Sequence, residues 1–187
     1  MLSNRSQRHF ARLAAVQALY QMEVNKQVPD VVVTEFKEFR MEEFSTGKDG
    51  KALDEALFSE IVINTGGKMA GFDRQIQGVL SGGWTISRLD PTTRALLRAA
   101  CYELDKKGSV PARVIIKEYV DISGRFSGKQ ETAFVNAALD TLARELRSDE
   151  MAGKQDATKI DELVKLMEKR CGSPRSDNEN LSPDSWS

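Results

Sequence analysis

Apolar residues recur every three or four positions along most of the chain, which is the spacing of one face of an α-helix. In the first segment this stripe consists of Leu13, Val16, Tyr20 and Val24. Similar stripes occupy residues 31–44, 53–64 and 72–80. The sequence has no alternating pattern of useful length that would favour a strand. The pattern therefore predicts an all-α protein.

Helix boundaries are sharper in the second half of the chain. Asp90 followed by Pro91 predicts an N-cap and a first helical turn, and Gly108 predicts a left-handed residue that closes this helix. Ser127 with Gln130 predicts a capping box at the start of a later helix. About seven helices are expected before the chain changes character.

That change comes after Arg147. We expect one domain over residues 1–147 and an acidic tail over residues 148–187. The tail contains one further amphipathic pattern, at about 156–170, and this helix either docks weakly or extends freely. From Gly172 onward the tail is rich in Ser, Asn, Asp and Pro, and this composition predicts disorder.

Composition narrows the class of protein. Hydrophobic residues make up 40% of the 187 residues, enough to bury a core, and no apolar run approaches the ~20 residues that span a bilayer. The formal net charge of −1 excludes nucleic-acid binding through overall charge, but it leaves room for a local basic patch. The first 22 residues contain three arginines and no acidic residue. Such a start is typical of either a binding patch or an organellar transit peptide.

Few residues of the chain carry obvious catalytic chemistry. The sequence has a single histidine, His9, which leaves no multi-histidine metal site. Its two cysteines, Cys101 and Cys171, are too few for a disulfide framework and are expected to be reduced. The Gly67-Lys68 pair lacks the upstream glycine of a phosphate-binding loop. We therefore expect a protein that is not an enzyme and that uses no metal or cofactor.

Three segments taken together point to a known family. They are ARLAAVQALYQ (11–21), RALLRAACYEL (94–104) with VP and VIIKE following it (110–118), and FVNAALD (134–140) preceded by Phe126. In this order and spacing the segments resemble the NusB family of bacterial transcription antitermination factors. The resemblance covers roughly residues 5–147.

This resemblance implies a fold and a role. The fold would consist of two small helical bundles packed across each other. The role would be cytoplasmic and non-catalytic: binding boxA, a short single-stranded RNA element, together with the ribosomal protein NusE. This pair would act in the RNA polymerase antitermination complex that transcribes ribosomal RNA operons. Some members of the family self-associate, so the resemblance also leaves a homodimer open.

The resemblance also implies which residues do the binding. The RNA contacts that it implies are Arg8, Arg12, Gln17, Phe126 and Phe134. The protein-partner contacts that it implies are Tyr20 and Thr93. Arg5 and Lys129 are added from their charge alone, because cations neutralise phosphates while aromatic rings stack on unpaired bases. Arg5, Arg8 and Arg12 are spaced by three and four, so a helix would present them on one side.

Other interpretations stay open at this point. Phe134 has the spacing of a core residue, Tyr20 lies on the apolar stripe, and the arginines suit an ordinary solvated face. His9 and Phe10 interrupt the arginine run of the family, which favours a protein–protein adaptor that binds RNA weakly or not at all. A third alternative is an accessory domain like that of a ribosomal RNA cytosine methyltransferase.

Overall fold

All regular elements in residues 4–44, 53–80 and 83–152 are helical. These are the residues that the structure, a computed structural model, describes. The helix expected at 156–170 and the end predicted to be disordered lie outside them. The all-α prediction is confirmed for the described part of the chain.

The elements follow the apolar stripes closely. They are α1 (Asn4–Asn25), α2 (Pro29–Phe39), the short 3₁₀ helix η1 (Met41–Phe44), α3 (Glu55–Gly66), α4 (Met69–Val79), the 3₁₀ helix η2 (Ile86–Arg88), α5 (Pro91–Lys106), α6 (Ala112–Ser123), α7 (Lys129–Leu146) and α8 (Ser148–Met151). The stripe over residues 31–44 covers two elements, because α2 ends at Phe39 and η1 follows it.

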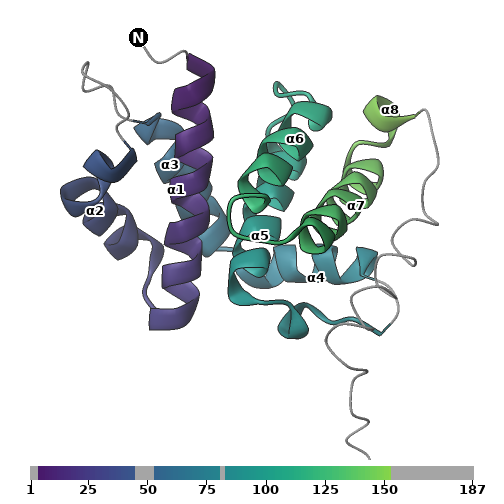
Figure 1. The fold of residues 1–187 in the computed structure, drawn as a ribbon, viewed down its shortest axis with the longest axis horizontal. Coiled ribbons are helices and arrows are strands. Elements are labelled where there is room, and N and C mark those ends of the chain that lie inside the picture. The colour runs from purple at the N-terminus through teal and green to yellow at the C-terminus, as the bar shows by residue number, and fades with distance from the viewer. Residues whose placement is uncertain (1–3, 45–52, 81–82, 153–187) are drawn as a thin grey trace, which may run out of the picture.

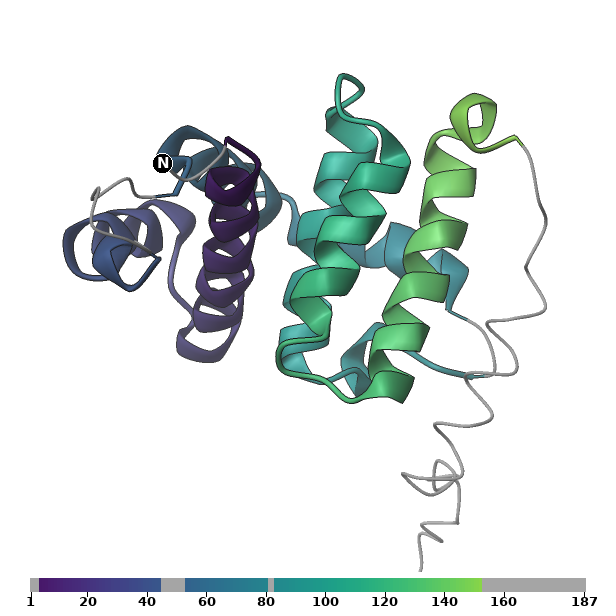
Figure 2. The same cartoon turned by 45° about the horizontal axis from the view of Figure 1, so that its top comes forward.

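The helices form two groups that share one hydrophobic core. Helices α1, α2 and α3 pack together on one side, and α4, α5, α6 and α7 pack on the other (Figure 1). Helix α5 joins the groups, because it contacts α1 and α3 as well as α4, α6 and α7. The expected pair of small bundles is therefore present. From a second direction, α1 stands beside α6, with α7 beyond it (Figure 2).

The start of α5 matches the prediction, but its end does not. The Asp90 carboxylate accepts hydrogen bonds from the backbone N–H groups of Thr92 and Thr93, each at 3.0 Å. Gly108 was expected to be left-handed, and this is wrong. Among the described glycines the residue with positive φ is Gly83, at 75°, in the turn before η2. The chain leaves α5 instead through Lys107, whose φ and ψ are −105° and 59°.

The predicted capping box at Ser127 and Gln130 is also wrong. Helix α7 begins at Lys129, so Gly128 occupies the N-cap position and provides no side-chain cap. Ser127 belongs to the preceding turn, because its N–H donates to the carbonyl of Ser123 at 2.9 Å. A difference of one residue in the helix start is enough to remove the motif.

Arg147 and the short helix α8 that follows it pack against the helical body. The Arg147 guanidinium donates to the carbonyl oxygens of Glu103, Leu104 and Val110, at 2.8, 2.6 and 2.6 Å. These bonds satisfy acceptors at the C-terminal end of α5 and in the following loop. Met151, in α8, is buried in the core. Arg147 thus fastens the end of α7 to α5.

A network of charged side chains fastens α1 to the second group of helices. The Glu23 carboxylate accepts from Arg94 and, at 2.5 Å, from Arg98. Arg98 also donates to both carboxylate oxygens of Asp73 on α4, at 2.6 and 2.9 Å. Burial on its own would raise the pKa of Glu23, but the hydrogen bonds and charges of the two arginines lower it below its usual range.

Candidate RNA-binding surface

A groove between α1 and α6 is lined mainly by positively charged side chains. We call it the basic groove; its charged lining consists of Arg5, Arg8 and Arg12 from α1 with Arg113, Lys117 and Glu118 from α6. Five cations thus face one carboxylate among its lining residues, and its volume is about 630 Å³. The prediction that the three α1 arginines share one side of a helix is confirmed. The surplus of cations makes the groove a surface for an anionic ligand.

The two outermost arginines of the groove are open to solvent. The side chains of Arg5 and Arg8 are 72% and 52% exposed. Each has one long ion pair: Arg5 with Glu118 at 3.6 Å and Arg8 with Asp54 at 3.9 Å. Exposed pairs of this length are weak and exchange readily. Both guanidinium groups can therefore turn toward a phosphate.

Arg12 differs from them, because it is buried. Its guanidinium makes two hydrogen bonds of 2.8 Å to the carboxylate oxygens of Glu103, which also accepts from the Tyr119 hydroxyl at 2.9 Å. The Arg12 side chain is 4% exposed and that of Glu103 is 0% exposed. Burial alone would lower the pKa of Arg12, but the hydrogen bonds and charge of Glu103 raise it. Arg12 lines the groove as part of a neutral buried pair, and its charge is already compensated.

Glu118 organises the floor of the basic groove. Its carboxylate is 2.9 Å from Nδ1 of His9 and 3.6 Å from Nε of Arg5. Its side chain is 5% exposed, so it supports these two residues from below rather than facing solvent. His9, which interrupts the arginine run in the sequence, is thereby tied to α6.

A second cavity lies behind Arg8 and Arg12, where α1 meets α3 and the end of α5. Its charged lining consists of Arg8, Arg12 and Lys107 with Asp54, Glu60 and Glu103. The three cations are matched by three carboxylates. The surplus of positive charge therefore belongs to the side of α1 that faces α6.

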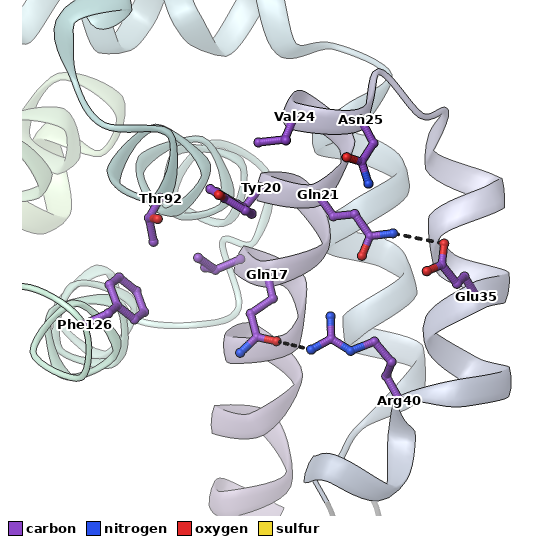
Figure 3. A pocket seen from close by; sticks show the side chains of 10 residues that line it. Gln17, Tyr20, Gln21, Val24, Asn25, Glu35, Arg40, Thr92 and Phe126 are labelled. Carbon is purple, nitrogen blue, oxygen red and sulfur yellow. Dashed lines mark hydrogen bonds between the residues drawn. The ribbon is translucent and has the colours of Figure 1, made fainter.

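Aromatic side chains gather farther along α1, in a pocket that we call the aromatic pocket (Figure 3). Six of its lining residues are Gln17, Tyr20, Gln21, Glu35, Arg40 and Phe126, and its volume is about 570 Å³. Tyr20 and Phe126 are 41% and 44% exposed, so part of each ring is open to solvent. Exposed rings of this kind can stack on unpaired bases or pack against a protein.

Two amide side chains line the same pocket, and both are oriented by neighbours on the α2 side. Arg40 donates to the Gln17 side-chain oxygen at 3.0 Å, and the Gln21 amide donates to Glu35 at 3.0 Å (Figure 3). With their orientations fixed, these amides can discriminate between hydrogen-bonding partners. Glu35 and Arg40 are the charged residues of the lining, so the pocket is close to neutral.

The remaining site residues expected from the sequence lie elsewhere. Phe134 is 1% exposed and packs against Trp84, so its ring is a core ring with no face open for a base. Thr93 is 5% exposed in the first turn of α5, and its neighbour Thr92 lines the aromatic pocket instead. Lys129 is exposed at the first position of α7. The turn that follows α6 therefore exposes Phe126, whereas α7 buries Phe134 in the core.

Sequence analysis missed the cations that face α1 from α6. Arg113 and Lys117 line the basic groove, and Arg125 lies over the ring of Phe10, 5.9 Å from its centroid. The four-residue spacing of Arg113 and Lys117 in the predicted helix was the available signal. The sequence alone did not predict that Arg113 and Lys117 would face α1.

The described residues also bear on three other kinds of feature: metal sites, membrane-spanning helices and a reactive thiol. Residues 4–44, 53–80 and 83–152 hold no group of three His, Cys, Asp or Glu side chains that could bind a metal ion. Within these ranges, no helix is both long and apolar enough to cross a membrane. Cys101 is buried, and burial together with two nearby carboxylates raises the pKa of its thiol to about 12. That thiol is therefore a packed side chain and not a nucleophile.

The described residues thus form an all-helical protein with a basic groove near the start of α1 and an aromatic pocket farther along it. The model of the NusB family matches residues 9–144. The chain is 44% identical over 148 residues to transcription antitermination protein NusB of Caulobacter vibrioides, covering 79% of this chain and 99% of that protein. It is 41% identical over 147 residues to the protein of that name from Nitrobacter hamburgensis, covering 79% and 92%. The chain belongs to the NusB family.

Solved structures agree on the fold. Thermotoga maritima NusB superposes with a TM-score of 0.63 at 25% identity, covering 78% of this chain and 97% of that one. A chain from the crystal structure of a plectonemic RNA supercoil superposes with a TM-score of 0.62 at 24% identity, covering 74% and 95%. The second likeness concerns the fold alone.

Proposed function

We propose that this protein is a non-catalytic antitermination factor that binds boxA-type single-stranded RNA together with the ribosomal protein NusE. Membership of the NusB family supports this role, as do the names of the relatives. The observation that carries the proposal is the surplus of cations in the basic groove of a chain whose net charge is −1. The complex would serve RNA polymerase in the cytoplasm, on ribosomal RNA operons.

Within this proposal the residues divide into contacts and supports. Arg5 and Arg8 neutralise phosphates, because they are exposed and weakly paired. Phe126 offers a ring on which an unpaired base can stack, and Gln17 an oriented amide nearby. Arg12 and Phe134 support the site from the core. Lys129 adds an exposed cation beyond the loop.

The protein partner is assigned by the same reasoning to the Tyr20 end of α1. Tyr20 is exposed beside a nearly neutral pocket, which suits a polypeptide better than a phosphate backbone. Thr93 is buried in the first turn of α5, so its side chain supports this surface from the core and does not contact the partner directly. Binding RNA and protein at adjacent positions would allow each to strengthen the other.

An electrophoretic mobility shift assay tests the proposal. Wild-type protein is titrated against a boxA-type oligonucleotide and against a scrambled oligonucleotide of the same composition, with and without NusE. We expect tighter binding to the boxA-type RNA, and tighter still when NusE is present. Equal affinity for both RNAs in both conditions would contradict the proposal.

A protein–protein adaptor with weak or lost RNA binding is the second candidate. It is favoured by the carboxylates already paired with the α1 arginines: Glu118 with Arg5, Asp54 with Arg8 and Glu103 with Arg12. Arg8→Ala separates the two functions. If the protein is an RNA-binding factor, this change lowers its affinity for RNA and leaves its affinity for NusE unchanged. If it is an adaptor, the change alters neither affinity. Solution mass with and without RNA would reveal a homodimer that hides the groove.

A further inference from the structure

We infer that α6 and the turn after it form a second RNA-binding wall: Arg113, Lys117 and Arg125 hold the backbone of a single strand from the side opposite Arg5 and Arg8. This inference rests on the proposed function and goes beyond the residues that the family resemblance implies. Its first support is the position of Arg113 and Lys117, which line the same groove as the α1 arginines.

The wall is accessible and its cations are available. Arg113 is exposed, and the Lys117 side chain is 59% exposed. Lys117 donates to Asp121 at 2.7 Å, one turn along the same helix. Such an exposed pair contributes little, so a phosphate can compete for the ammonium group. The Ala112 N–H and, to a smaller extent, the charges of Arg147 and Arg113 lower the pKa of Glu150 on α8.

Helices α1 and α6 run in the same direction along the groove. Near their starts, Arg113 and Lys117 share a cavity with Arg5 and Arg8. Beyond the end of α6, Phe126 shares a cavity with Gln17 and Tyr20, farther along α1. Figure 2 shows the two helices side by side. One strand could therefore follow both helices without changing direction.

Arg125, in the turn that follows α6, faces α1. Its guanidinium lies over the ring of Phe10, 5.9 Å from the centroid, so it crosses from the end of α6 toward α1. The distance along α1 from Arg5 to Tyr20 is about 22 Å, at 1.5 Å per residue. That length accommodates about six stacked nucleotides at 3.4 Å each, which is more than a lone phosphate or nucleotide needs.

Charge favours an RNA strand over a protein at this wall. Because Glu103 neutralises Arg12, four cations of the basic groove remain against its single carboxylate, which is a surplus of three positive charges. A polyanion with a regular phosphate spacing neutralises several such cations at once and releases their counterions. An acidic segment of a protein partner is the competing occupant, and the experiment below separates the two.

The test measures the salt dependence of RNA binding by full-length Arg113→Ala, Lys117→Ala and Arg125→Ala variants. Each should reduce the magnitude of the slope of log K against log salt by about 0.7, and should weaken binding about fivefold near 0.1 M salt. Arg74→Ala is the matched control, because it removes one exposed positive charge from α4, which lines neither cavity. Its slope and affinity should equal those of the wild type.

The outcomes also distinguish this inference from the proposed function. If Arg8→Ala weakens RNA binding while the three α6 variants behave like Arg74→Ala, the second wall is wrong and the proposed function stands. If the α6 variants lose affinity for NusE in the absence of RNA and keep their RNA affinity, the wall binds protein and the inference is overturned. If the wild type fails to bind the RNA at all, the proposed function itself falls. Thermal unfolding of each variant verifies that it is folded.

Discussion

Arg12 offers the sharpest test of how the groove is built. The resemblance implies that it contacts RNA, whereas its side chain is buried with both ends of its guanidinium fork on Glu103. Replacing Arg12 with Met keeps the apolar part of the side chain and leaves the Glu103 carboxylate buried without its counter-charge. Removing one partner of a buried pair costs about 3–5 kcal/mol of unfolding free energy. Arg12→Met should therefore destabilise the protein by about that amount.

The second variant in the test is the double mutant Arg12→Met/Glu103→Gln. It removes both charges, while the glutamine oxygen can still accept the hydrogen bond of the Tyr119 hydroxyl. The double mutant should be more stable than Arg12→Met alone, because no buried charge is left uncompensated. Arg8→Met is the matched control. Its side chain is 52% exposed, so it should change stability by only about 0.5 kcal/mol.

Urea denaturation monitored by circular dichroism provides the free energies, and an RNA-binding assay on the folded variants completes the test. Because the double mutant removes a neutral pair, the charge of the basic groove is unchanged, and RNA affinity should stay within about threefold of the wild type. The reasoning would be refuted if Arg12→Met were as stable as Arg8→Met. It would also be refuted if a well-folded double mutant lost RNA binding.

Three further predictions follow from burial and charge. Phe134→Ala should lower the free energy of unfolding by about 3–5 kcal/mol, and Phe126→Ala should lower it far less, because of these two rings only that of Phe134 is fully buried. Chemical denaturation of both variants measures the difference. In a Cys171→Ser background, Cys101 should react with a maleimide at pH 8 only after unfolding, since its thiol has a pKa of about 12; labelling of the folded protein would contradict this. The pKa of Glu23 is lowered in the folded state, so its contribution to stability is present above its unfolded pKa of about 4.5 and is lost as pH falls through the folded value. Glu23→Gln should therefore lose less stability than the wild type when the pH falls below that value. Urea denaturation at several pH values measures the loss, and an equal loss in the two proteins would count against the network.

Local sequence signals predicted the helices well, because each depends on residues close together in the chain. The apolar stripe of α1 and the Asp90 N-cap of α5 are examples. The shared side of Arg5, Arg8 and Arg12 follows from helical spacing in the same way. The capping box failed because it needed the start of α7 to within one residue.

The site was less predictable because it depends on contacts between distant segments. The partner that buries Arg12 is Glu103, 91 residues away, and no local pattern connects the two. Phe126 and Phe134 are similar residues eight positions apart, and only the packing of α7 onto the core separates an exposed ring from a buried one. Likewise, Lys117 lines the basic groove only because α6 lies beside α1.

The central claim is that one face, formed by α1 and α6, holds an unpaired RNA strand. Photo-crosslinking tests it most directly: a boxA-type RNA carrying 4-thiouridine at single positions is irradiated with the full-length protein, and the crosslinked peptides are identified by mass spectrometry. The account predicts crosslinks near Arg8, near Lys117 and near Phe126, in positions that move along the groove as the label moves along the RNA. Crosslinks confined to α4 or to the exposed face of α2 would contradict it.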